Sequence, residues 1–144
     1  MNGKNKKNEK MEKIDRRTKM LIIPETTSET TDTAKSKLTE ALKEEDTIFL
    51  LFRSDSQNES QIQGIVTTAD NYAQKWGKEM YRVVWIKKQD ILKDIADKYF
   101  GNDKKIIAVS LRCGAGEPRE VVSKYELSEI DDTIKIGRAF SNAA

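Results

Sequence analysis

The chain has 144 residues, of which 37% are hydrophobic and 35% are charged, and its formal net charge is +2. This length fits one domain with one core, and the small net charge gives no bulk field that would attract nucleic acid or an anionic membrane. Histidine is absent and cysteine occurs once, which excludes histidine general bases, histidine zinc ligands and intrachain disulfides.

The chain begins with a charged segment, residues 1–19, that has few sizeable apolar side chains. Such a segment buries too little apolar surface to offset its ordering entropy, so we expect a disordered tail followed by one domain at residues 20–144. The basic residues of the tail are Lys4, Lys6, Lys7, Lys10, Lys13, Arg16, Arg17 and Lys19. They predict either a solubilising tail or an arm that docks on nucleic acid or on a partner protein. No apolar run is long enough for a membrane span or a signal core, so we expect a soluble cytoplasmic protein.

Apolar periodicity in residues 20–144 predicts alternating strands and helices. Short apolar or alternating runs indicate strands at residues 19–24, 47–53, 80–86, 105–111 and 119–127. Apolar residues at helical spacing indicate helices at residues 33–45, 62–76, 91–100 and 128–140. The run TIFLLFR at 47–53 is nearly continuous, which is typical of a central strand buried on both faces of a parallel sheet. The cluster CGAGEP at 113–118 predicts a turn that joins the last two strands as a hairpin.

The elements follow one another as strand, helix, strand, helix, strand, helix, strand, strand and helix. Between Met20 and Phe140, this order resembles the thioredoxin superfamily. The resemblance implies an α/β fold, a thioredoxin-like three-layer sandwich with a mixed sheet.

Two hallmarks of that superfamily are missing from the chain. Thioredoxins carry a Cys-x-x-Cys motif where the second strand's loop enters the second helix, but the matching loop, SDSQNES at 54–60, has no cysteine. They also carry a cis-proline just before the fourth strand, and residues 101–105 contain no proline. The resemblance therefore implies a redox-inactive member that needs no cofactor.

The candidate binding residues belong to the polar loop after the second strand. They are Ser54, Asp55, Ser56, Gln57 and Asn58. Because backbone amides at a helix N-terminus point toward such a loop, the loop could bind an anion or a peptide, or it could simply cap the helix. A serine nucleophile here would have only Asp55 and Glu59 as nearby bases.

Cys113 is a possible reactive thiol, because the neighbouring Arg112 would favour its thiolate; the alternative is an ordinary turn cysteine. The carboxylates of the second half show no calcium-loop spacing, so we expect no metal site among Asp94, Asp97, Asp103, Glu129, Asp131 and Asp132. The aromatic residues near the second helix and third strand predict core packing rather than a stacking platform. They are Tyr72, Trp76, Tyr81 and Trp85.

These features favour a non-catalytic thioredoxin-like domain that binds another protein. Nucleic-acid binding is the first alternative, through the basic tail and through Arg53, Lys75, Lys78, Lys87 and Lys88. A weak redox or hydrolytic enzyme is the second alternative, using Cys113 or the Ser54 loop.

Overall fold

The computed structural model describes residues 20–24, 30–44, 47–77, 80–112 and 120–143, and for residues 76–77 it describes the backbone alone. The strands are β1 (Leu21–Ile23), β2 (Ile48–Arg53), β3 (Tyr81–Ile86), β4 (Ile106–Arg112) and β5 (Glu120–Glu126). The helices are α2 (Thr31–Leu42), α3 (Glu59–Gly77), α4 (Lys93–Phe100) and α5 (Thr133–Ala143), with a short 3₁₀ helix, η1 (Leu127–Glu129). The predicted α/β class is confirmed. The predicted tail at 1–19 and Cys113 lie outside the described residues.

The five described strands form one mixed sheet in the order β1-β3-β2-β4-β5. Strands β1, β3 and β2 are parallel, β4 runs antiparallel to β2, and β5 runs antiparallel to β4. The spatial order differs from the chain order, because α2 carries the chain from β1 past the place of β3 to β2. Strand β2 is in the middle of the sheet and every one of its residues is buried, which confirms the prediction of a central strand at 47–53.

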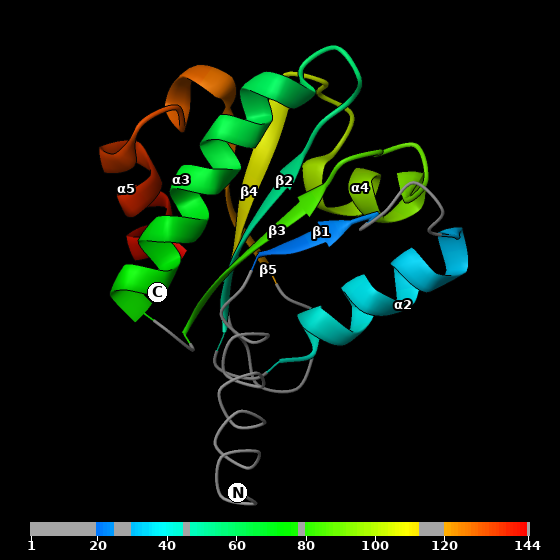
Figure 1. Cartoon of the computed structure of the whole chain (residues 1–144), viewed down its shortest axis with the longest axis horizontal. Helices are drawn as coiled ribbons and strands as arrows, with labels where there is room; N and C mark the ends of the chain where they lie inside the picture. The colour runs from blue at the N-terminus through cyan, green and yellow to red at the C-terminus, as the bar shows by residue number, and fades with distance from the viewer. Residues whose placement is uncertain (1–19, 25–29, 45–46, 78–79, 113–119, 144) are drawn as a thin grey trace, which may run out of the picture.

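Helices cover both faces of the sheet, so the fold has three layers (Figure 1). One face carries α3 and α5, whose apolar side chains pack on Leu50, Phe52 and Trp85. The other face carries α2 and α4, whose apolar side chains pack on Phe49 and Leu51. Because side chains alternate along a strand, successive residues of β2 belong to different cores.

The aromatic residues support the core-packing prediction where their side chains are described. Trp85 and Tyr81 are 3% and 8% exposed and lie in the core under α3 and α5. Tyr72 is partly buried against the same core and stacks on Phe140. Core packing is thereby confirmed for Tyr81 and Trp85.

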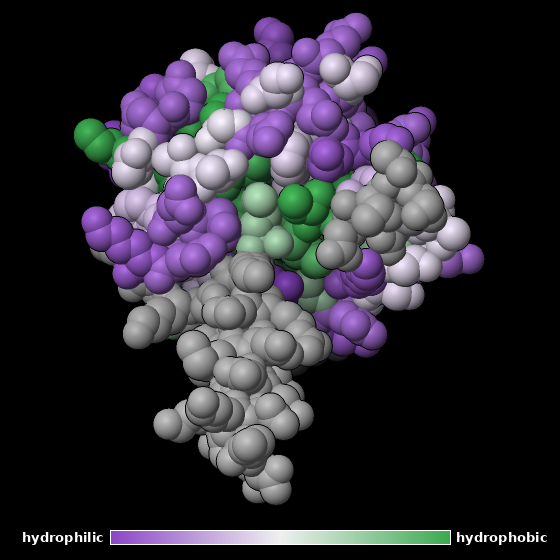
Figure 2. All heavy atoms as spheres, in the orientation of Figure 1, coloured by the Kyte–Doolittle hydropathy of each residue, from purple (hydrophilic) through white to green (hydrophobic). Residues whose placement is uncertain are grey.

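Strand β1 forms one edge of the sheet. Its residues Leu21 and Ile22 are half-buried, whereas Ile23 is fully buried. Figure 2 shows mostly polar surface on this side of the molecule, with a small apolar area near the centre, where β1 lies in Figure 1. No helix in the described part of the chain is long and apolar enough to cross a membrane.

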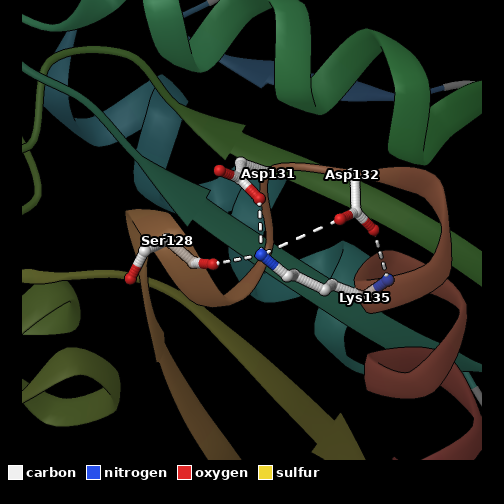
Figure 3. Close-up of polar contacts among 4 residues, drawn as sticks. All are labelled: Ser128, Asp131, Asp132 and Lys135. Atoms are coloured by element: carbon white, nitrogen blue, oxygen red, sulfur yellow. Dashed lines mark hydrogen bonds and ion pairs between the residues drawn. The ribbon is translucent and has the colours of Figure 1, made fainter.

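The last helix begins later than the sequence pattern indicates. Residues 127–129 form η1, and α5 starts at Thr133 because Asp132 accepts a hydrogen bond from the Lys135 amide at 2.9 Å. The Lys135 ammonium donates to the Ser128 carbonyl at 2.6 Å and to the Asp131 carboxylate at 2.9 Å (Figure 3). These contacts close a turn between η1 and α5, so the prediction of a continuous helix capped by Ser128 was wrong.

Candidate functional site

The carboxyl ends of the parallel strands form the edge of the sheet where a site is expected. After β2 the chain passes to α3 on one face, and after the neighbouring β3 it passes to α4 on the other face. Ligands of open α/β sheets bind in the crevice where neighbouring strands diverge in this way. The residues that follow β2 and β3 therefore border the candidate site.

Ser54, the first predicted site residue, is 1% exposed. By alternation it points to the face of α3, and its Oγ accepts a hydrogen bond from the Trp85 indole Nε1 at 2.7 Å. The same hydroxyl donates to the Lys87 carbonyl at 3.3 Å. Ser54 thus links β2 to the end of β3. A buried hydroxyl bonded in this way is poorly placed to attack a substrate.

Asp55 and Asn58 close the loop on itself. The Asp55 carboxylate accepts hydrogen bonds from the backbone amides of Gln57 at 2.9 Å and Asn58 at 3.1 Å. In return, the Asn58 side-chain oxygen accepts from the Asp55 amide at 2.8 Å. Ser56 and Gln57 are exposed at the tip of the loop. The loop therefore forms a closed turn before α3 and presents two polar side chains to solvent.

Lys87 borders the same edge from the end of β3. Its ammonium lies 3.7 Å from a carboxylate oxygen of Glu59 in the first turn of α3, and 5.2 Å from the centre of the Trp85 ring. The ammonium therefore lies beside the first turn of α3 and the Trp85 ring. Its charge is partly neutralised by Glu59, so this lysine contributes little net positive potential.

A groove opens next to this edge, on the face of α4. Its volume is about 510 Å³, which is enough for a short peptide segment or a small molecule. Its polar lining consists of Arg53, Gln89, Asp90, Lys93, Asp97, Asn102 and Lys104. A second hollow of about 190 Å³ shares Asp90 and Lys93 with it and reaches Thr31 and Lys35 of α2. We call the larger hollow the Arg53 groove.

Arg53 reaches the groove because it is the last residue of β2 and alternates with Phe49 and Leu51 toward α4. Its Nε donates to the Ile106 carbonyl at 2.8 Å, and its Nη2 donates to the Asp103 carbonyl at 2.7 Å. The carbon of the guanidinium lies 4.7 Å from the centre of the Phe100 ring. These contacts fix the guanidinium against the start of β4.

The structure does not gather the other basic residues that were predicted to bind nucleic acid. Arg53, Lys87 and Lys88 lie at the carboxyl edge of the sheet, whereas Lys75 belongs to the last turn of α3, which ends at the opposite edge. Lys78 is outside the described residues. Among the described residues, these lysines and Arg53 therefore do not form a single basic surface.

The carboxylates that lacked calcium-loop spacing are also spread out in space. Asp131 and Asp132 bind Lys135, and Asp103 accepts a hydrogen bond from the Lys105 amide at 3.0 Å. No group of three or more aspartate, glutamate or cysteine residues within the described ranges could hold a metal ion.

The Arg53 groove has no simple signature in the sequence. Arg53 is separated from its hydrogen-bond partners Asp103 and Ile106 by 50 and 53 residues. The only local signal is a charged residue at the end of an apolar run, which is also how an ordinary strand ends.

Comparisons with known proteins found no match: no family model, no curated protein and no solved structure is significantly similar to the chain.

Proposed function

We propose that the chain is a non-catalytic, thioredoxin-like domain that binds another protein at the carboxyl edge of its sheet. The observation that carries the proposal is the groove of about 510 Å³, lined mostly by polar side chains, which includes Arg53, the residue directly before the 54–58 loop. A polar groove of this size suits an extended segment of a partner, whereas pockets for apolar small molecules are mainly lined by hydrophobic side chains.

The fold class supports the thioredoxin-like part of the proposal. Helices cover both faces of a sheet whose first three strands are parallel and whose last two are antiparallel to their neighbours. The non-catalytic part is supported by the state of Ser54, whose hydroxyl is buried and bonded to Trp85 and Lys87. The chain also has no histidine to activate a nucleophile.

Affinity capture from the native host tests the proposal when it is combined with charge-reversal variants of the full chain. Lys93→Glu changes the groove, Gln57→Arg changes the loop tip, and Arg138→Glu makes the same charge change as Lys93→Glu on α5, at the other face. We expect one stoichiometric protein partner that is lost with Lys93→Glu or Gln57→Arg and retained with Arg138→Glu.

Two results would count against the proposal. Loss of the partner with Arg138→Glu alone would place the interface on the α3 and α5 face. Recovery of nucleic acid in place of a protein, with binding that weakens steeply as salt is raised, would favour the basic tail as the binding element.

A further inference from the structure

The guanidinium of Arg53 is only partly used by the fold. A guanidinium has five N–H groups, and the bonds to Ile106 and Asp103 use Nε and one hydrogen of Nη2, on one side of the planar group. Nη1 makes no hydrogen bond with any residue that the structure describes. The edge formed by Nη1 and the second Nη2 hydrogen is the edge that pairs with two oxygens of one anion.

The charge of Arg53 is buried without a contacting counter-ion. Arg53 is 7% exposed and forms no ion pair with the described residues. Burial lowers the pKa of the guanidinium from its ordinary value, although the more distant carboxylates of Asp97 and Asp103 act in the opposite direction. The guanidinium stays charged at neutral pH, although burial removes part of its hydration. A bound anion would compensate for that lost hydration.

The other charges of the groove limit which anion fits. Lys93 and Lys104 add to the positive charge of Arg53, whereas Asp90 and Asp97 oppose it, which leaves the lining with one net positive charge. A singly charged carboxylate would neutralise this lining. A doubly charged phosphate would exceed it and would also be repelled by the two aspartates.

We propose that the Arg53 groove binds a carboxylate group, held by the free edge of the Arg53 guanidinium and attracted by Lys93 and Lys104. The inference rests on the proposed function in one respect: the carboxylate is taken to belong to a partner protein, as an acidic side chain or a chain terminus. The groove chemistry itself can be tested without that partner.

The test is a titration of the full-length ¹⁵N-labelled chain with sodium acetate, compared with sodium chloride at equal ionic strength. We expect saturable shifts of the Asn102 and Lys104 amides and of the Arg53 Nε–H signal with acetate alone. The acetate shifts should disappear in Arg53→Gln, and affinity should fall about five-fold in the double variant Lys93→Gln/Lys104→Gln.

The double variant keeps the test decisive if Arg53→Gln does not fold, because both lysines are exposed. Its matched control is Lys43→Gln/Arg138→Gln, which removes two exposed positive charges away from the groove and should bind acetate as the unmodified chain does. Equal shifts with acetate and chloride, or equal weakening in the two double variants, would overturn the proposal.

Three further probes identify the source and class of the anion. A capped alanine–glutamate–alanine peptide carries a side-chain carboxylate, an acetylated trialanine carries a terminal carboxylate, and inorganic phosphate carries neither. Binding of either peptide, but not of a capped alanine–glutamine–alanine peptide, supports the carboxylate site. Tighter binding of phosphate than of acetate contradicts it. If acetate binds in the groove but the protein partner is retained by the groove and loop variants, the proposed function alone is rejected. If the partner depends on the groove but acetate does not bind, the carboxylate site alone is rejected.

Discussion

Two polar regions lie at the carboxyl edge of the sheet, and they use their hydrogen-bonding groups differently. In the 54–58 loop, the Ser54 hydroxyl, the Asp55 carboxylate and the Asn58 amide oxygen each bond to a partner within the fold. In the groove, Arg53 bonds two carbonyls, while its Nη1 has no hydrogen bond with the described residues. Groups that are satisfied internally stabilise the fold, whereas spare donors in a hollow are available to a ligand.

This difference assigns the loop mainly to stability and the groove mainly to binding. The predicted binding residues of the loop are consequently of two kinds. Ser54 joins β2 to the end of β3, Asp55 closes the loop, and the exposed Ser56 and Gln57 remain candidates for contact with a partner. The comparison fails if substitutions show that the loop residues Ser54 and Asp55 are unimportant for folding, or that the groove lysines Lys93 and Lys104 are essential to it.

The largest expected effect is that of Ser54→Ala. The variant leaves the buried Trp85 indole N–H without its acceptor, so the free energy of unfolding should fall by about 1–3 kcal/mol. Urea unfolding followed by circular dichroism measures the change. The exposed Ser56→Ala is the matched control and should change the free energy of unfolding by less than about 0.5 kcal/mol.

A double-mutant cycle with Trp85→Phe shows whether the indole bond is the cause. If it is, Ser54→Ala should cost less in the Trp85→Phe background than in the unmodified chain, because no N–H is left unpaired. Equal costs in both backgrounds would mean that the hydroxyl acts through the Lys87 carbonyl or through packing.

Asp55→Ala should have a smaller effect, about 1 kcal/mol in the free energy of unfolding. The substitution removes the acceptor for the backbone amides of Gln57 and Asn58, in the turn before α3. Urea unfolding compares it with Gln57→Ala, which changes an exposed side chain of the same turn. Acetate binding should be unchanged in Asp55→Ala. A loss of acetate binding with the fold intact would show that loop and groove form one site.

Local sequence signals account for the elements, while the site depends on contacts that are distant in sequence. The apolar run at 47–53 and the helical spacing at 62–76 match β2 and α3, because each pattern reflects burial of its own element. Ser54, in contrast, was predicted as a binding residue, and its bond to Trp85 spans 31 residues. Spacing along the chain cannot show such a partner, nor can it show that Arg53 meets the start of β4.

Asp70 on α3 lies outside both regions and combines their properties, because only one of its two carboxylate oxygens is bonded within the fold. One carboxylate oxygen accepts a hydrogen bond from Gln74 at 2.8 Å, and the other is buried without a partner. Burial raises the pKa of Asp70 above its ordinary 3.8, against the smaller opposing effect of the hydrogen bond from Gln74.

The raised pKa determines how stability should change with pH. A raised folded-state pKa means that folding favours the protonated form of Asp70. The contribution of this carboxyl to the free energy of unfolding is therefore complete below its unfolded-state pKa, and it is lost as pH rises through its folded-state pKa. Asp70→Asn should therefore be more stable than the unmodified chain at neutral pH, by less than the Ser54→Ala change, and should lose this advantage below about pH 4. Urea unfolding at both pH values tests this, with the exposed Glu40→Gln as control. A variant less stable than the unmodified chain at neutral pH would show that the hydrogen bonds to Asp70 outweigh its burial.

The smallest effect on stability is expected for the groove variant Lys93→Gln/Lys104→Gln. Both lysines are exposed and form no ion pair with the described residues, so the free energy of unfolding should change by less than about 0.5 kcal/mol. Loss of the positive charge at Lys93, the first residue of α4, should even favour the helix slightly. Urea unfolding and acetate titration of the same sample separate the two roles. If stability falls by more than about 1 kcal/mol, the lysines belong to the fold as the loop residues do, and the distinction between loop and groove fails.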